Sequence, residues 1–189
     1  MAIQSATFLR STPRRVNGAR PNGVTESAVI ADRGPDWVVP TLHDAGLMTV
    51  MRVTEAVIWP DPFARTQWFA AKYEETFTKP PIFPDHDPII VNVGGHALFG
   101  SELYLRARQC RFGWAGSLAF AAAASAVWEY AFEGNGVRPS AFDLVYTPMT
   151  GILFGELRHI AWRSVTPNSP VRWIVDPLGQ GERALGTGC

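Results

Sequence analysis

The sequence predicts an all-α fold, a compact bundle of about five helices over residues 36–163. Segments with apolar residues at helical spacing alternate with Pro- and Gly-rich stretches, and two of these segments open with a capping-box pattern. The chain has 189 residues, which is long enough for one domain with a sizeable core.

The first two predicted helices lie within residues 41–77. Residues 41–44, Thr-Leu-His-Asp, fit a capping box, and the apolar residues that follow continue until Trp59-Pro60 ends the helix. The second helix, over about residues 64–77, repeats an aromatic residue every four positions, which gathers these rings on one face.

Three longer helices are predicted in the second half of the chain. Residues 78–88 contain four prolines and form an extended arm rather than a helix. Helices follow over about residues 93–110, 113–132 and 140–162. Pro148 lies inside the last of them and is expected to kink it, because proline removes one backbone hydrogen bond.

The last two of these helices are rich in small residues and are predicted to pair as an antiparallel hairpin. Residues 112–128 contain no charged side chain, and Gly151 and Gly155 form a GxxxG motif. Small residues let helix backbones approach closely, both in membranes and in tight soluble hairpins. Two interpretations therefore stand: the hairpin is buried in a compact domain, or it is embedded in or lies on a membrane.

The two ends of the chain lack a sustained hydrophobic period. Residues 1–35 are rich in Ser, Thr, Pro, Gly, Asn and Arg and are predicted to form a disordered arm. Residues 164–189 are rich in Pro and Gly and are predicted to form an irregular tail. No apolar run follows the N-terminal arginines, so the chain as given is expected in the cytosol unless a longer form is exported.

Charge and cysteine content restrict the function classes. Seventeen basic and 17 acidic residues give a formal net charge of zero, which removes the electrostatic argument for nucleic-acid binding. Cys110 and Cys189 match no metal-binding spacing. A disulfide between them is possible, but two cysteines form no framework that predicts it.

Acidic residues near the join of the two small-residue helices are the candidate functional positions. Burying a carboxylate costs several kcal/mol unless it is paired, hydrogen-bonded or protonated. His96 lies near the start of its helix, where the helix dipole disfavours the charged imidazolium and leaves a neutral base. If the helices pack together, His96, Glu129 and Glu156 converge as a catalytic acid/base pair with an orienting partner.

The alternative is that the same glutamates form a buried structural network that locks the hairpin. Ser140 and Asp143 are most simply explained as a capping box at the start of the last helix. The two interpretations differ in access, because a catalytic site needs a pocket that reaches His96.

Neither a metal nor a cofactor is predicted. Glu156 and His159 form one E-x-x-H motif, whereas a di-iron carboxylate bundle needs two such motifs and two further glutamates. Asp85, His86 and Asp87 form a second possible ligand cluster, but they lie among prolines in the extended arm. The phosphate-, dinucleotide- and zinc-binding motifs and the GxSxG nucleophile motif are missing from the sequence.

One ordered set of residues resembles a known family. The set comprises Asn92, Gly95-His96, Gly100, Tyr104, Ala107-Arg108, Ser125, Trp128-Glu129, Pro139-Ser140, Asp143, Thr147-Pro148, Gly151 and Gly155-Glu156. In order and spacing it is similar to the bacterial domain-of-unknown-function family 3943, over about residues 85–163 and extending to Asp176-Pro177. The family usually has proline after the histidine, where this chain has Ala97.

The resemblance implies a location rather than a reaction. The family has no established activity, and its longer members look like exported envelope proteins of Gram-negative bacteria. The chain is therefore expected to be an envelope-associated helical module with a buried His/Glu/Ser network and a membrane or envelope component as partner. The alternative is a hydrolase or transferase that acts on a lipid or envelope substrate through His96 and a glutamate.

Overall fold

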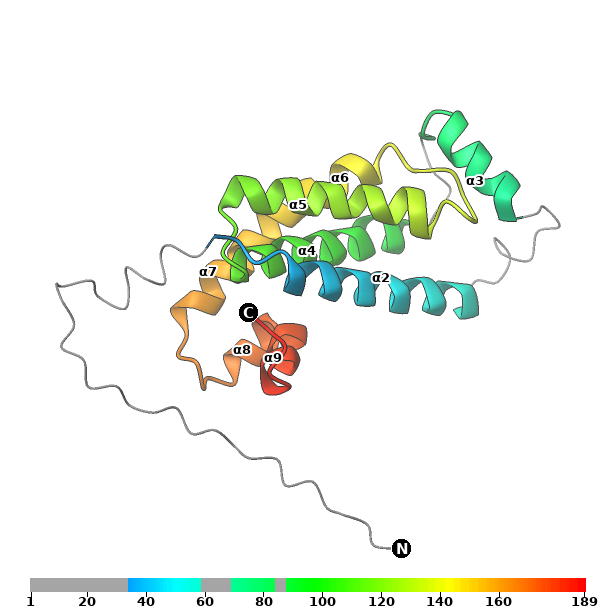
Figure 1. Cartoon of the computed structure of the whole chain (residues 1–189). Helices are drawn as coiled ribbons and strands as arrows, with labels where there is room; N and C mark the ends of the chain where they lie inside the picture. Colours follow the sequence, from blue (N-terminus) through cyan, green and yellow to red (C-terminus); the bar gives the residue numbers. More distant parts are fainter. Residues whose placement is uncertain (1–33, 59–68, 84–87) are drawn as a thin grey trace, which may run out of the picture. The chain divides into compact units, whose positions relative to one another are not determined.

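The structure, a computed structural model, describes residues 34–58, 69–83 and 88–189 and confirms the all-α prediction (Figure 1). The helical segments in chain order are α2 (Val38–Ile58), α3 (Phe69–Thr78), η1 (Ile90–Gly95), α4 (His96–Gln109), α5 (Trp114–Val127), η2 (Trp128–Phe132), α6 (Asp143–Thr150), η3 (Gly151–Gly155), α7 (Glu156–Ser164), α8 (Val171–Val175) and α9 (Pro177–Ala184). The segments labelled η are π-helical.

Helix α4 forms the centre of the fold. It packs against α2, α5, α6, η3 and α7, and in Figure 1 it runs between α2 and α5. Phe99, Leu103 and Tyr104 of α4 join Met48 of α2 and Trp128 of η2 in the main hydrophobic core. Because neighbours cover α4 so thoroughly, its polar side chains must find partners inside the protein.

Three of the predicted helices contain a π-helical segment. η1 directly precedes His96, η2 contains Glu129, and η3 spans Gly151–Gly155. A π-turn inserts an extra residue and so rotates the side chains that follow it around the helix axis. The apolar period of the sequence does not reveal these segments, because it assumes an unbroken turn of 3.6 residues.

Three glycines let α6 and η3 lie directly on α4. A Cβ atom on Gly100 would lie 2.0 Å from the carbonyl oxygen of Thr147, and one on Gly151 would lie 2.7 Å from the carbonyl oxygen of Gly100. A Cβ atom on Gly155 would lie 2.8 Å from the ring of Tyr104. The predicted close contact at Gly151 and Gly155 is thus confirmed, and α5 packs against α6 and η3 as predicted, but α5 is not the helix that these two glycines contact. The partner is α4, because Gly100 there supplies a second backbone without a side chain.

Helix α2 begins at Val38 rather than at the predicted Thr41. The carboxylate of Asp36 accepts hydrogen bonds from the amides of Val38 at 3.0 Å and Val39 at 3.4 Å, and these bonds cap the helix. The capping-box prediction for residues 41–44 is wrong, because these residues lie inside the helix, where Asp44 is buried.

The C-terminal segment is helical, which corrects the predicted irregular tail. Asp176 accepts a hydrogen bond from the amide of Gly179 at 3.0 Å and caps α9, which starts at Pro177. Cys189 forms a disulfide with Cys110, and their Cα atoms are 5.3 Å apart. An aspartate followed by proline is a helix-start signal that a segment rich in Pro and Gly can also carry.

Some predictions concern residues that the structure does not describe. The predicted disordered arm, except for residues 34–35, and the start of the helix predicted over residues 64–77 lie outside the described residues. Among the residues that are described, no helix has both the length and the apolar character needed to cross a bilayer.

Candidate functional site

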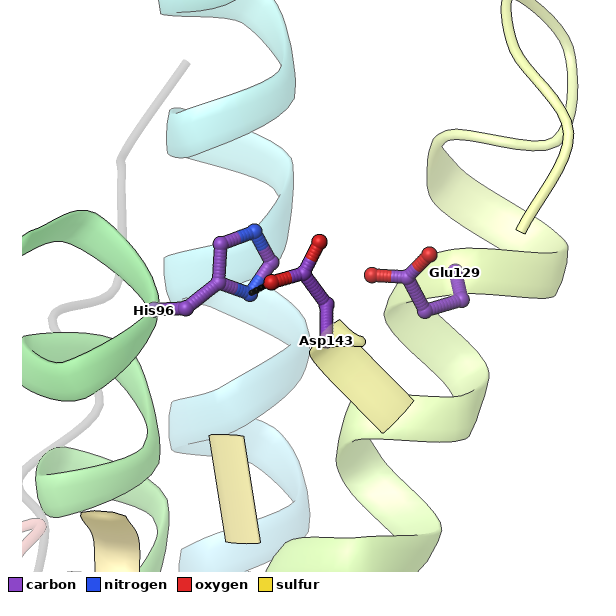
Figure 2. A group of neighbouring side chains, drawn as sticks. All are labelled: His96, Glu129 and Asp143. Carbon is purple, nitrogen blue, oxygen red and sulfur yellow. Dashed lines mark ion pairs between the residues drawn. The ribbon is translucent and has the colours of Figure 1, made fainter. Parts of the chain in front are cut away.

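His96, Glu129 and Asp143, here called the trio, meet in the interior of the domain (Figure 2). They are contributed by the start of α4, by η2 and by the start of α6. Their exposed fractions are only 5%, 1% and 1%. One ligand atom of each residue lies within 4.8 Å of those of the other two, and Figure 2 shows the Asp143 carboxylate between the other two side chains.

Hydroxyl-bearing residues in and before α6 contact the trio. Nδ1 of His96 lies 2.9 Å from Oγ1 of Thr147 and 3.6 Å from Oδ1 of Asp143. The carboxylate of Glu129 accepts a hydrogen bond of 2.7 Å from the backbone amide of Ser140. Three separate helices are thereby joined by buried polar contacts.

Ser140 caps α6 only partly in the predicted way. Its hydroxyl accepts a hydrogen bond from the amide of Asp143 at 3.1 Å, as a capping box requires. The amide of Ser140, however, bonds to Glu129 from η2. Capping therefore explains Ser140 but not the position of the Asp143 carboxylate, which faces His96. Asp143 was part of the family-like pattern. Because a capping box was enough to explain this residue, its contact with His96 was not predicted.

Glu156 does not join His96 and Glu129, contrary to the predicted convergence. Its carboxylate accepts hydrogen bonds from the hydroxyl of Tyr104 at 2.8 Å and from the guanidinium of Arg108 at 2.8 and 3.1 Å. The hydrogen bond from Arg108 lowers the pKa of Glu156. The extra residue of the η3 π-turn precedes Glu156, so its direction could not be inferred from a regular helix.

The two predicted metal-ligand patterns also differ from the trio. His159 of the E-x-x-H motif is buried and stacks on Trp162, with ring centroids 6.1 Å apart. Burial lowers the pKa of His159. Within the described part of the chain, Glu156 and His159 belong to no three-residue group with converging ligand atoms. The cluster of residues 85–87 lies outside the described residues.

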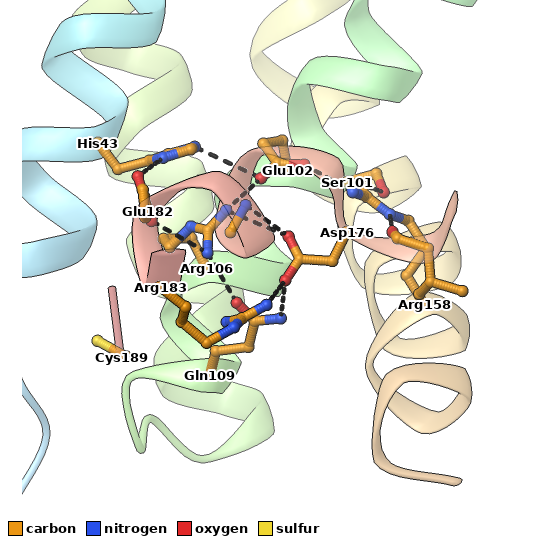
Figure 3. A network of polar contacts seen from close by, with 12 residues as sticks. His43, Ser101, Glu102, Arg106, Gln109, Arg158, Asp176, Glu182, Arg183 and Cys189 are labelled. Carbon is orange, nitrogen blue, oxygen red and sulfur yellow. Dashed lines mark hydrogen bonds and ion pairs between the residues drawn. The ribbon is translucent and has the colours of Figure 1, made fainter. Parts of the chain in front are cut away.

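A second buried polar cluster surrounds Arg106, the fully buried arginine of α4 (Figure 3). Its guanidinium lies 2.8 Å from Glu102, 3.3 Å from Asp176 and 3.2 Å from Glu182. Asp176 also accepts a hydrogen bond of 2.7 Å from Gln109. These contacts fasten α9 to α4, which is a structural role that no local pattern in the sequence indicates.

Glu102 connects this cluster to the neighbouring helices. It pairs with Arg158 of α7 at 2.7 Å and with His43 of α2 at 3.4 Å. Burial alone would raise the pKa of Glu102, but the His43 hydrogen bond and the charges of Arg158 and Arg106 lower it to about 2. The carboxylate is therefore ionised at all physiological pH values.

An apolar cleft of about 550 Å³ lies between α2 and α5. Aromatic and aliphatic side chains form most of its wall, among them Trp37, Met48, Phe112, Phe120 and Phe132. Asp44 lines the same cleft, is 3% exposed, and has no hydrogen bond to either carboxylate oxygen within the described residues. Burial raises the pKa of Asp44 to about 8, so this carboxyl group is mostly neutral at pH 7.

We expect Asp44→Asn to stabilise the protein increasingly as the pH rises. The folded state keeps the Asp44 proton up to about pH 8, whereas the unfolded chain releases it near pH 3.8. Between these values the folded state binds more protons, so the contribution of Asp44 to stability falls with rising pH. The asparagine variant should match the wild type near pH 4 and exceed it by about 5 kcal/mol at pH 8, because about four pKa units separate the two states. Urea unfolding of both proteins across this range measures the difference, and a pH-independent difference would contradict the assignment.

Comparison with known proteins agrees with the family resemblance. The family model described as a domain of unknown function, DUF3943, matches residues 81–180. No curated protein and no solved structure matches the chain. The matched segment is longer than the expected 85–163 and contains the trio, Glu156 and Asp176. Since it covers more than half of the 189 residues, the chain belongs to the DUF3943 family of domains of unknown function.

Proposed function

We propose that the chain is a non-catalytic helical module of the bacterial cell envelope. The Cys110–Cys189 disulfide carries this proposal. Disulfides form and persist in oxidising compartments such as the periplasm and are rare in the reducing cytosol. This bond joins the end of α4 to the C-terminal segment, so it would fix the fold in an exported protein.

The burial of the trio supports a structural role over a catalytic one. A hydrolase or transferase must bring its substrate within hydrogen-bond distance of the acid and base. His96 is 5% exposed. No residue of the trio lines the cleft beside Asp44, and none lines a second, open cleft that contains Met149. The network instead joins α4, η2 and α6 through contacts that are sealed from solvent.

An exposed apolar face supports association with an envelope component. Met149, Leu153, Leu157 and Ile160 follow one another along α6, η3 and α7, and each is 57% exposed. They line an open cleft of about 680 Å³. Contiguous exposed apolar side chains of this kind mark interaction surfaces more often than simple solvent contact.

Thiol trapping and cell fractionation of the native gene product test this proposal. We expect the protein in the envelope fraction, with both cysteines protected from a maleimide until a reductant is added. In the purified protein, Cys110→Ser with Cys189→Ser should lower the free energy of unfolding by about 2–4 kcal/mol, because the bond closes a long loop.

The double serine variant is also the control for maleimide labelling, since it cannot react at either position. Soluble cytosolic protein whose two cysteines are labelled at once in freshly lysed cells would contradict the envelope assignment. An unfolding free energy that the reductant does not change would contradict the structural role of the bond.

A further inference from the structure

We propose that His96, Glu129 and Asp143 bind one divalent transition-metal ion, of the Zn²⁺ or Mn²⁺ class. The proposal goes beyond the envelope module, because it assigns a ligand to the buried trio. It rests on three donor groups whose ligand atoms lie within 4.8 Å of one another. A single ion at the centre of such a group is within reach of all three donors after small side-chain shifts, because metal–ligand bonds are about 2.0–2.2 Å long.

The types of donor select the class of ion. One imidazole and two carboxylates combine a nitrogen ligand with oxygen ligands. Imidazole favours Zn²⁺ and iron over the alkaline-earth ions, whereas carboxylates also accept Mn²⁺. No thiolate is in the group, so the soft ion Cu⁺ is disfavoured.

Burial gives the second argument. Glu129 and Asp143 are each 1% exposed. Carboxylates that are buried this deeply are commonly paired, or they coordinate a metal ion.

The trio is also held as a metal site requires. The backbone amide of Ser140 donates a hydrogen bond of 2.7 Å to one oxygen of Glu129 and so fixes that carboxylate. Such outer contacts orient ligands and restrict their motion. Because the three ligands come from α4, η2 and α6, bound metal would tie together the three segments that form the core.

The test measures metal content and the thermal response of the protein. The full chain, purified on a tag without histidine, is stripped with dipicolinate, and its melting temperature is recorded before and after addition of ZnCl₂ or MnCl₂. We expect one equivalent of metal by plasma mass spectrometry and a higher melting temperature after addition. Glu129→Gln and Asp143→Asn keep the side-chain size and should each weaken binding by at least about 100-fold.

Glu156→Gln is the matched control, because Glu156 pairs with Arg108 outside the trio and should leave metal binding unchanged. The proposal is overturned if folded wild-type protein retains neither ion and its melting temperature does not respond to either. It is also overturned if Glu129→Gln binds as tightly as the wild type, or if Glu156→Gln is the variant that loses the metal. Should the trio variants fail to fold, the wild-type measurements alone decide.

Discussion

Gly100→Ala is expected to lower the free energy of unfolding by about 3 kcal/mol or more, or to prevent folding. The new Cβ atom would lie 2.0 Å from the carbonyl oxygen and 2.9 Å from the carbonyl carbon of Thr147. These are backbone atoms and cannot rotate away, so α6 must separate from α4. Since Thr147 also bonds to His96, the separation would disturb the trio as well.

Gly46→Ala is the matched control for this substitution. Gly46 lies within α2, and a Cβ atom there would meet nothing within 4 Å. Alanine is a better helix former than glycine, so this variant should gain about 0.5–1 kcal/mol. Denaturant unfolding of both variants measures the contrast. A Gly100→Ala protein as stable as the wild type would show that the backbone contact between α4 and α6 is not as close as described.

Asp176→Ala is expected to cost about 3–5 kcal/mol, because it removes one of the buried counter-charges of Arg106 and leaves two buried hydrogen-bond donors without their acceptor. Asp176 is fully buried and faces Arg106, which is itself fully buried, at 3.3 Å. It also accepts hydrogen bonds from Gln109 at 2.7 Å and from the amide of Gly179 at 3.0 Å. Its removal therefore takes away a counter-charge and the cap of α9 together.

Two comparisons separate these contributions. Asp176→Asn removes the charge but keeps an oxygen that can still cap α9, so it should be less harmful than alanine. Glu75→Ala removes a half-buried surface carboxylate that pairs with Lys79, and its effect should stay within about 0.5 kcal/mol. Limited proteolysis should cut Asp176→Ala in α8 and α9 before the rest of the described domain. Equal stability of Asp176→Ala and the wild type would contradict the role assigned to this cluster.

The candidate site could be predicted only in part. The cost of burying acids in an apolar hairpin singled out Glu129, and a position near the start of a helix singled out His96; both lie in the trio. The third predicted member, Glu156, pairs with Arg108 instead, and Asp143 takes a place in the trio. Residue type and spacing indicate which side chains need partners, but the rotation of each helix decides which partner is reached.

The Arg106 cluster was not predicted at all. Its members come from two distant parts of the chain: Glu102 and Arg106 lie in α4, whereas Asp176 lies just before α9 and Glu182 within it. Taken singly in the sequence, each of these residues looks like an ordinary charged residue on the protein surface. Their burial follows only from the return of the C-terminal segment to α4.

By itself, the sequence determined the all-α class, the places of the main helices and the need for close backbone contact at Gly151 and Gly155. These properties depend on interactions between residues close in the chain, such as the spacing of apolar residues and the lack of a side chain at glycine. Only the tertiary structure decided that α4 is the partner of these glycines, and that Asp143 rather than Glu156 faces His96. Those outcomes depend on contacts between residues more than 40 positions apart in the chain. They also depend on the rotation of each helix, which the π-turns at η2 and η3 change. A local pattern carries no information about such long-range packing.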